Sequence, residues 1–278
     1  MRTRILILVL LLTALWVVPA AASAASKTET KTSGQVSVVL TYKTGRFRFD
    51  VTKTHIKITR AGVTLLDAAV AEPCRDCGVA PSGYMLGKSI QIADIDGDGE
   101  PEVLLDLYTG GMHCCTNTWI YRYTGSAYAS TARLWGDVGY TLKDLNGDGI
   151  PELRSFDDRF AYAFAPYVAS WFPPMVLQYR AGTFTDVTRS FPALAAKDAA
   201  RALRVYRRRT RHQDDQRGVV AAYVADQYLL GHPARGWKLA RSANKHGALN
   251  GLGRGDQFPR NGRFLKSLRR FLAKTGYS

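Results

Sequence analysis

The sequence has 278 residues, of which 46% are hydrophobic and 22% charged, and its formal net charge is +15. After the N-terminal segment, no stretch is apolar enough to cross a membrane, which excludes a protein with several spanning helices. The surplus of positive charge indicates an anionic partner.

The N-terminal segment MRTRILILVLLLTALWVVPAAASAAS is typical of a signal peptide. Arg2 and Arg4 give it a basic start, an apolar stretch follows, and Ala-Ser-Ala at 22–24 is a small-residue cleavage site. We therefore predict a signal peptide over 1–24 and a secreted, extracellular or cell-envelope protein. The alternative is an uncleaved anchor, although the apolar stretch is shorter than the roughly 20 residues that a span needs.

The next 11 residues, 25–35, are polar and predict a flexible leader. A mostly β domain is expected over 36–191, because runs of β-forming residues alternate there with turn-forming glycines. The predicted strands lie at 36–42, 46–51, 55–60, 63–66, 119–123 and 176–179. The many aromatic residues of this region are expected to pack the sheets rather than bind a cofactor.

An acidic stretch, DIDGDGEPE at 94–102, recurs as DLNGDGIPE at 144–152. In each copy, carboxylate or amide side chains stand two residues apart, so a tight turn brings their oxygens together around a hard cation. A glycine fills the sixth position, where the backbone turns sharply, and a main-chain carbonyl stands at the seventh. Ligands that are all oxygen select calcium over zinc or copper.

Both copies match only the first half of the EF-hand signature. Position twelve is Leu105 or Ser155 instead of Glu, and Pro101 and Pro151 prevent a helix from starting inside the loop. An apolar run after the first copy is typical of a buried strand. We therefore predict strand, calcium loop, strand, with two ion-free Asp/Gly-rich turns as the alternative.

This pattern resembles the calcium loop of FG-GAP or VCBS-type repeats, as in integrin-alpha-like β-propellers, over residues 88–155. The resemblance implies two calcium ions, each held by acidic side chains and one main-chain carbonyl. The implied ligands are Asp94, Asp96, Asp98, Glu100 and Glu102 for the first ion, and Asp144, Asn146, Asp148, Ile150 and Glu152 for the second. Because Asn146 lowers the charge of the second loop, that site is expected to be weaker.

Two such loops are too few for a closed propeller, which needs at least about four blades. We therefore expect an α+β chain. Its mostly β domain would contain two propeller-like strand–loop–strand units, and a basic α-helical region would follow over 192–278.

The four cysteines comprise a C-x-x-C pair, Cys74 and Cys77, and two neighbours, Cys114 and Cys115. An even number in an exported chain predicts two disulfides. A bridge between neighbours is strained, so the first pair is expected to bond to the second in an order that stays open. The alternatives are a zinc site completed by His113 and a thioredoxin-like redox pair.

The C-terminal region, 192–278, changes to helical spacing, with helices expected over 194–211, 219–230 and around an apolar stripe that ends at Gly276. It contains 19 basic and 5 acidic residues, whereas 26–191 contains 17 and 18. The stripe consists of Phe264, Leu265, Leu268, Phe271 and Leu272. One interpretation lays this stripe on a membrane surface; the interpretation we favour packs it on its own domain.

The concentration of positive charge predicts contact with an anionic surface polymer, lipid head groups, acidic polysaccharide or extracellular nucleic acid, without any motif for a specific nucleic-acid reader. The candidate contact residues are Arg207, Arg208, Arg209, Arg211, Lys266, Arg269, Arg270 and Lys274.

No catalytic motif stands out: the chain has no G-x-S-x-G, no H-E-x-x-H and no phosphate-binding glycine loop. We therefore predict a secreted, non-enzymatic protein with structural calcium and no catalytic residues. The alternatives are an exported hydrolase of wall or polysaccharide, which would show a concave site with paired carboxylates away from the loops, and a calcium-dependent adhesin.

Overall fold

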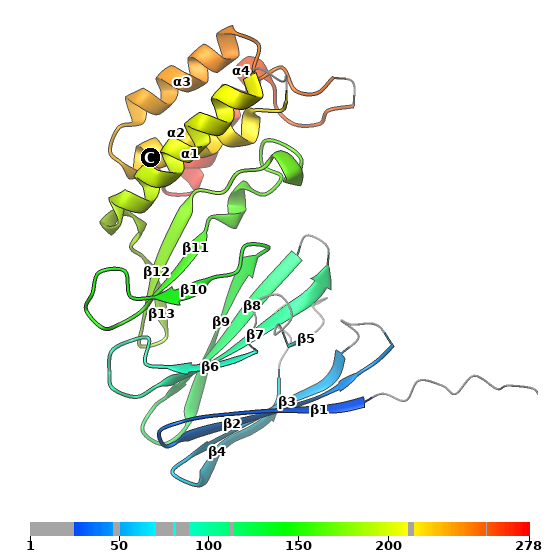
Figure 1. The fold of residues 1–278 in the computed structure, drawn as a ribbon, viewed down its shortest axis with the longest axis vertical. Coiled ribbons are helices and arrows are strands. Elements are labelled where there is room, and N and C mark those ends of the chain that lie inside the picture. The colour runs from blue at the N-terminus through cyan, green and yellow to red at the C-terminus, as the bar shows by residue number, and fades with distance from the viewer. Residues whose placement is uncertain are drawn as a thin grey trace, which may run out of the picture.

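The fold is mixed, with strands in the N-terminal part and four helices in the C-terminal part, as the α+β prediction requires (Figure 1). The computed structural model describes residues 25–46, 51–70, 80–81, 89–111, 114–210, 214–253 and 255–278. The predicted signal peptide, Cys74, Cys77, His113 and Arg211 lie outside these residues.

The first sheet is antiparallel and follows chain order. Its strands are β1 (Ala25–Ser33), β2 (Val36–Thr44), β3 (Val51–Arg60) and β4 (Val63–Ala69). The expected flexible leader is therefore corrected: residues 25–33 form β1, which pairs along the whole of β2. The strand is polar and mostly exposed, so the ladder to β2, rather than burial of its own side chains, holds it in place.

Two further antiparallel sheets follow. The second consists of β5 (Ala80–Pro81), β6 (Ile90–Ala93), β7 (Glu102–Gly111), β8 (Cys114–Tyr123) and β9 (Tyr128–Gly136). The third consists of β10 (Thr141–Lys143), β11 (Glu152–Phe156), β12 (Pro174–Arg180) and β13 (Thr183–Asp186). The first acidic loop joins β6 to β7 and the second joins β10 to β11, and each joins antiparallel neighbours.

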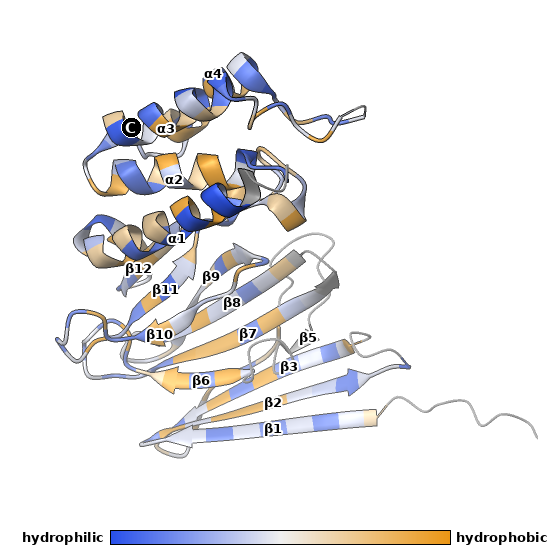
Figure 2. Ribbon diagram, turned by 45° about the horizontal axis from the view of Figure 1, so that its top comes forward, coloured by the Kyte–Doolittle hydropathy of each residue, from blue (hydrophilic) through white to orange (hydrophobic). Residues whose placement is uncertain are grey.

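The central strand β7 is buried on both faces and takes part in two hydrophobic cores. Val103 and Leu105 pack with residues of the first sheet, whereas Leu104 packs with residues of the third. This division follows from the two-residue period of a strand. In Figure 2 the hydrophobic colour is accordingly strong along β6 and β7. The three sheets form no closed propeller or barrel within the described residues.

The helical part surrounds one buried helix. The helices are α1 (Pro192–Thr210), α2 (Arg217–Leu229), α3 (Pro233–Lys245) and α4 (Asn261–Lys274), and three short 3-10 helices, η2 (Asp158–Phe160), η3 (Tyr167–Ala169) and η4 (Thr188–Ser190), precede them. Nearly every residue of α2 is buried. Phe264, Leu268 and Leu272 of α4 are fully buried in the same core, so the apolar stripe packs on its own domain. No helix in the part of the chain that the structure describes is long and apolar enough to cross a membrane.

Candidate cation site at the junction of three sheets

The first acidic loop is closed by hydrogen bonds to its own carboxylates. Asp94 accepts from the backbone N–H groups of Gly97 at 2.6 Å and Gly99 at 3.0 Å. Both glycines have positive φ, 78° and 88°, a conformation that side chains other than glycine rarely adopt. These contacts turn the chain so that three of its acidic side chains come together.

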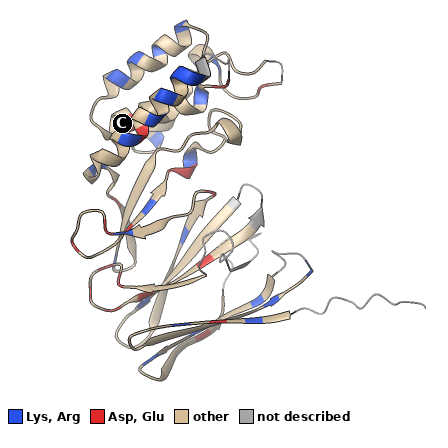
Figure 3. Cartoon of the chain, viewed as in Figure 1, with Lys and Arg blue, Asp and Glu red and all other residues tan. Residues whose placement is uncertain are grey.

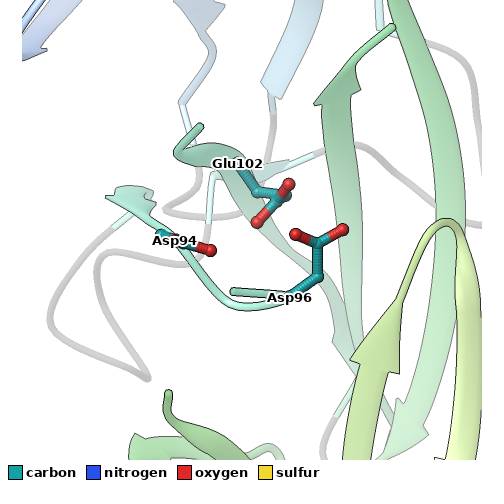
Figure 4. A group of neighbouring side chains, drawn as sticks. All are labelled: Asp94, Asp96 and Glu102. Atoms are coloured by element: carbon teal, nitrogen blue, oxygen red, sulfur yellow. The ribbon is translucent and has the colours of Figure 1, made fainter. Parts of the chain in front are cut away.

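Three carboxyl groups converge inside the turn. Asp94, Asp96 and Glu102 each offer an oxygen, and these oxygens lie within 4.8 Å of one another (Figure 4). Glu102 is the first residue of β7 and only 1% exposed. Its Oε2 accepts the Ile95 N–H at 2.9 Å, while its Oε1 is buried without a hydrogen-bond partner. A buried oxygen in this state costs about 1–3 kcal/mol, and more when charged.

The electrostatics of this loop are unfavourable without a positive charge. Burial, together with the charges of Asp96, Asp98 and Asp94, raises the pKa of Glu102 to about 8, against the lowering effect of the Ile95 N–H. The described residues place no lysine or arginine in an ion pair with any of these four carboxylates. A cation would supply the missing charge.

The side chains of the other two predicted ligands, Asp98 and Glu100, already have hydrogen-bond partners. The Asp98 side chain accepts the Glu100 N–H at 2.8 Å and is not among the three converging carboxyls. The Glu100 carboxylate pairs with Arg60, whose Nε donates at 3.0 Å. The prediction that Glu100 contributes through its main-chain carbonyl is therefore compatible with this geometry.

The same loop contacts all three sheets. Arg60 ends β3 of the first sheet, and Glu102 begins β7 of the second. In the β12–β13 turn of the third sheet, the Ala181 N–H donates to Asp96 at 3.2 Å, and Arg180 Nη1 donates to the Ile95 carbonyl at 3.2 Å. Ordering this loop therefore orders the junction of the sheets.

The second loop repeats the backbone pattern of the first. Asp144 accepts from Gly147 and Gly149 at 2.7 and 2.9 Å, and Glu152 Oε2 accepts the Leu145 N–H at 2.9 Å. Its turn is therefore built like that of the first loop.

The second loop differs from the first because side-chain amides donate hydrogen bonds to its carboxylates. Asn146 Nδ2 donates to Asp148 Oδ2 at 2.9 Å, and Gln178 Nε2 on β12 donates to Glu152 Oε1 at 3.3 Å. The oxygen that corresponds to the unpartnered one in the first loop is thus satisfied. Among the described residues, the acids of this loop form no converging group.

The cysteine prediction is tested only at one position. Cys115 is disulfide-bonded, so it is neither a zinc ligand nor a free thiol here. Because Cys74 and Cys77 lie outside the described residues, the pairing between the two cysteine groups stays a prediction.

A second group of carboxyls lies in the helical part. Asp226 of α2 is fully buried beside Asp198; burial, the charge of Asp198 and a hydrogen bond shared with it raise the pKa of Asp226 well above the usual value. Asp198 of α1 accepts the Trp171 indole N–H at 3.0 Å and lines a cavity of about 270 Å³. This pair could not be predicted from the sequence, because its members are 28 positions apart on different helices.

Comparison with known proteins finds a family that matches the helical part and relatives that are similar over a longer stretch of the chain. Residues 195–276 match the family described as the sll0997 C-terminal domain. The "Probable thylakoid lumen protein sll0997" of Synechocystis sp. is 30% identical over 155 residues, which are 54% of this chain and 46% of that protein. "Uncharacterized protein y4bJ" of Sinorhizobium fredii is 30% identical over 143 residues, 50% of this chain and 22% of that protein. The chain therefore spans less than half the length of either relative. No solved structure matches.

These matches correct the FG-GAP or VCBS-type resemblance, which was wrong. The family that matches is the sll0997 C-terminal domain, and no FG-GAP or VCBS repeat is shown. The physical reason is that a nine-residue Asp/Gly loop suits many connections between antiparallel strands. Such a loop indicates local chemistry but does not identify a family.

Proposed function

We propose that the protein is an exported calcium-binding protein in which one ion, held by the loop at 94–102, fixes the junction of the three sheets. The ligands would be the side chains of Asp94, Asp96 and Glu102 and the main-chain carbonyl of Glu100. The observation that carries the proposal is the buried Oε1 of Glu102, which lies among carboxylates and has no partner.

The chemistry of the donors favours calcium. Calcium takes six to eight oxygen ligands, including carboxylates, carbonyls and water, in flexible geometry. Three carboxylates and one carbonyl supply part of that set, and water would complete it. No nitrogen or sulfur ligand takes part, which disfavours zinc and copper.

The role we propose for the ion is structural. At free calcium of one to ten times the dissociation constant, a single site adds only about 0.4 to 1.4 kcal/mol of stability. That is enough to order a loop on which three sheets meet. Export is supported by the predicted signal peptide and by the name of the Synechocystis relative, a probable thylakoid lumen protein.

A single strong site is favoured over the two that the repeated sequence predicts. In the second loop, the Asn146 and Gln178 amides already donate to the carboxylates that would bind an ion. A cation there must displace these hydrogen bonds, so its affinity is expected to be lower.

The carboxyl pair in the helical part lends little support to the hydrolase alternative. Cleavage of a glycosidic bond typically uses two carboxyls that both reach the substrate. Asp198 lines the cavity, whereas Asp226 is fully buried and does not. The adhesin alternative would require chelation to abolish binding to a surface, and it stays a prediction.

Calorimetric titration of the protein with calcium tests the proposal, with Glu102→Gln and its matched control Glu152→Gln. We expect binding with a dissociation constant on the order of 0.1 to 1 mM, weakened at least about tenfold by Glu102→Gln and little changed by Glu152→Gln. In thermal melting, the chelator should lower the melting temperature of the native protein and of Glu152→Gln more than that of Glu102→Gln. Absence of binding at millimolar calcium, or equal loss in both variants, would contradict the proposal.

A further inference from the structure

Nearly all exposed charged side chains of the helical part are positive. Of its five acidic residues, Asp198, Asp215 and Asp226 are buried, and the Asp256 side chain is 7% exposed and pairs with buried Arg217. Asp214 is the one exposed acid there among the described residues. The exposed basic residues are Lys197, Arg201, Arg204, Arg207, Arg208, Arg235, Lys238, Arg241, Lys245, Arg260, Arg263, Lys266, Arg269, Arg270 and Lys274. Figure 3 shows this charge along α1 and α3.

One end of the helical bundle collects several chain segments. The end of α3 meets the start of α4, because the Asn261 N–H donates to the Leu249 carbonyl at 3.0 Å. The start of α2 meets η3: a Cβ on Gly218 would lie 2.1 Å from the Ala169 carbonyl oxygen. α1 ends at Thr210, seven positions before α2 begins at Arg217, so the end of α1 lies near the same place. We call this region the loop end of the bundle.

The loop end also exposes large apolar side chains. Val168 is 87% exposed, Leu252 62% and Tyr162 48%. Tyr162 and Leu252 come from different loops yet line one cavity of about 400 Å³ together with Phe258. Apolar side chains gathered in this way, with polar surroundings, mark an interaction surface.

Basic residues occupy the helix ends that meet at the loop end. Arg207 and Arg208 lie in the last turns of α1, Lys245 ends α3, and Arg260 and Arg263 lie at the start of α4. All five are exposed. The loop end therefore combines positive charge with accessible apolar groups, which is the pattern of a surface that binds anionic lipid.

We propose that the loop end of the helical bundle docks on an anionic phospholipid bilayer. The basic residues would contact lipid phosphates, while Val168 and Leu252 would enter the boundary between head groups and acyl chains. A soluble polyanion would use the charge but leave the apolar residues without a partner. This inference does not rest on the proposed calcium site, since none of its residues belongs to the 94–102 loop.

Cosedimentation with vesicles of phosphatidylcholine, with and without one-third phosphatidylglycerol, tests this inference on secreted protein freed of the predicted signal peptide. One variant changes Arg207, Arg208, Arg260 and Arg263 to Gln. A matched control changes Lys197, Arg235, Lys238 and Lys274, nearer the other end of their helices, to Gln. A third variant is Val168→Ser with Leu252→Ser. Circular dichroism checks that each variant is folded, and inorganic polyphosphate serves as the soluble polyanion.

We expect binding only to the anionic vesicles, weakened at least about tenfold by the loop-end variant and less than about threefold by the control. The Val168/Leu252 variant should weaken vesicle binding but leave polyphosphate binding unchanged. Equal losses in the loop-end and control variants would overturn the inference, because they would indicate unspecific attraction. Unchanged vesicle binding by the Val168/Leu252 variant would overturn it in favour of a soluble polyanion. Failure to bind anionic vesicles would overturn it outright.

Discussion

Ile150 of the second acidic loop packs directly against Gly97 of the first. A Cβ atom on Gly97 would lie 2.4 Å from Ile150 Cδ1, whereas nonbonded carbons prefer about 3.5–4.0 Å. Gly97 also has a φ of 78°. The absence of a side chain at this one position therefore lets the two copies of the loop lie side by side.

Gly97→Ala should lower the free energy of unfolding by about 1–3 kcal/mol, because it adds a clash to an unfavourable φ. Gly147→Ala is the matched control: it occupies the same place in the second loop, with a φ of 81° and nothing within 4 Å. It should cost only the backbone strain, about 1 kcal/mol. Urea unfolding of both variants compares the two. Ile150→Ala should restore part of the stability of Gly97→Ala, and equal losses in the two alanine variants would contradict this account.

Asn146→Asp is expected to create a second calcium site. The change removes the amide that donates to Asp148 and adds a carboxylate, so the second loop becomes more like the first. Calorimetry should show one additional ion bound, and the calcium-free variant should melt below the native protein because its carboxylates repel. Asn146→Ala removes the amide without adding charge and should bind no additional ion. A stoichiometry unchanged at millimolar calcium would refute the prediction.

The elements that the sequence predicted well are those whose apolar residues are large and regularly spaced. Strand β2 and helix α4 are of this kind, whereas α1 was predicted from its Ala, Arg and Leu content and α2 from apolar residues three and four positions apart. Helix α3 was missed because three of its four buried residues are Gly236, Ala240 and Ala243, which give a weak hydrophobic signal. Strand β1 was missed because its stability comes from pairing with β2, which its own polar residues do not reveal.

The site was predicted in part for a related reason. The repeated spacing was sufficient to name the acidic residues of both loops. It was not sufficient to show that the carboxylates of the second loop accept hydrogen bonds from side-chain amides. Gln178, which donates to Glu152, comes from β12, 26 positions later in the chain. The partner of Glu100, Arg60, comes from another sheet, 40 positions earlier. Contacts between elements decide the difference between the two loops, and a local pattern does not contain them.

Arg217 is fully buried, and its replacement should be among the most damaging in the helical part. Its Nε donates to Asp215 at 3.0 Å and its Nη1 to Asp256 at 3.2 Å. Arg217→Met would leave both carboxylates buried without a positive partner, at a cost of about 3–5 kcal/mol. Thermal melting should therefore show a much larger loss for Arg217→Met alone than for Arg217→Met combined with Asp215→Asn and Asp256→Asn. Equal losses would indicate that packing, rather than the charges, stabilises this region.

Asp106 on β7 is a fully buried carboxyl whose partners are all neutral. Thr118 Oγ1 donates to it at 2.6 Å, the Tyr140 hydroxyl at 2.9 Å and Gln91 Nε2 at 3.0 Å. Burial raises the pKa of Asp106 to about 6, against the lowering effect of these three donors. The described residues place no lysine or arginine in an ion pair with it.

The contribution of Asp106 to stability should fall as the pH rises from about 4 to about 6. In the unfolded chain its pKa is about 3.9, so within this window the folded state binds more protons than the unfolded state, and the free energy of unfolding decreases by about 3 kcal/mol in total. Asp106→Asn removes this dependence, so the stability difference between variant and native protein should change across the window and be constant above it. Tyr140→Phe removes one donor to the carboxylate, which raises the folded-state pKa of Asp106 further and should therefore extend the window to higher pH. Urea unfolding at half-unit pH steps measures both effects, and a difference between Asp106→Asn and the native protein that stays flat from pH 4 to 7 would show that Asp106 is ionised in the fold throughout.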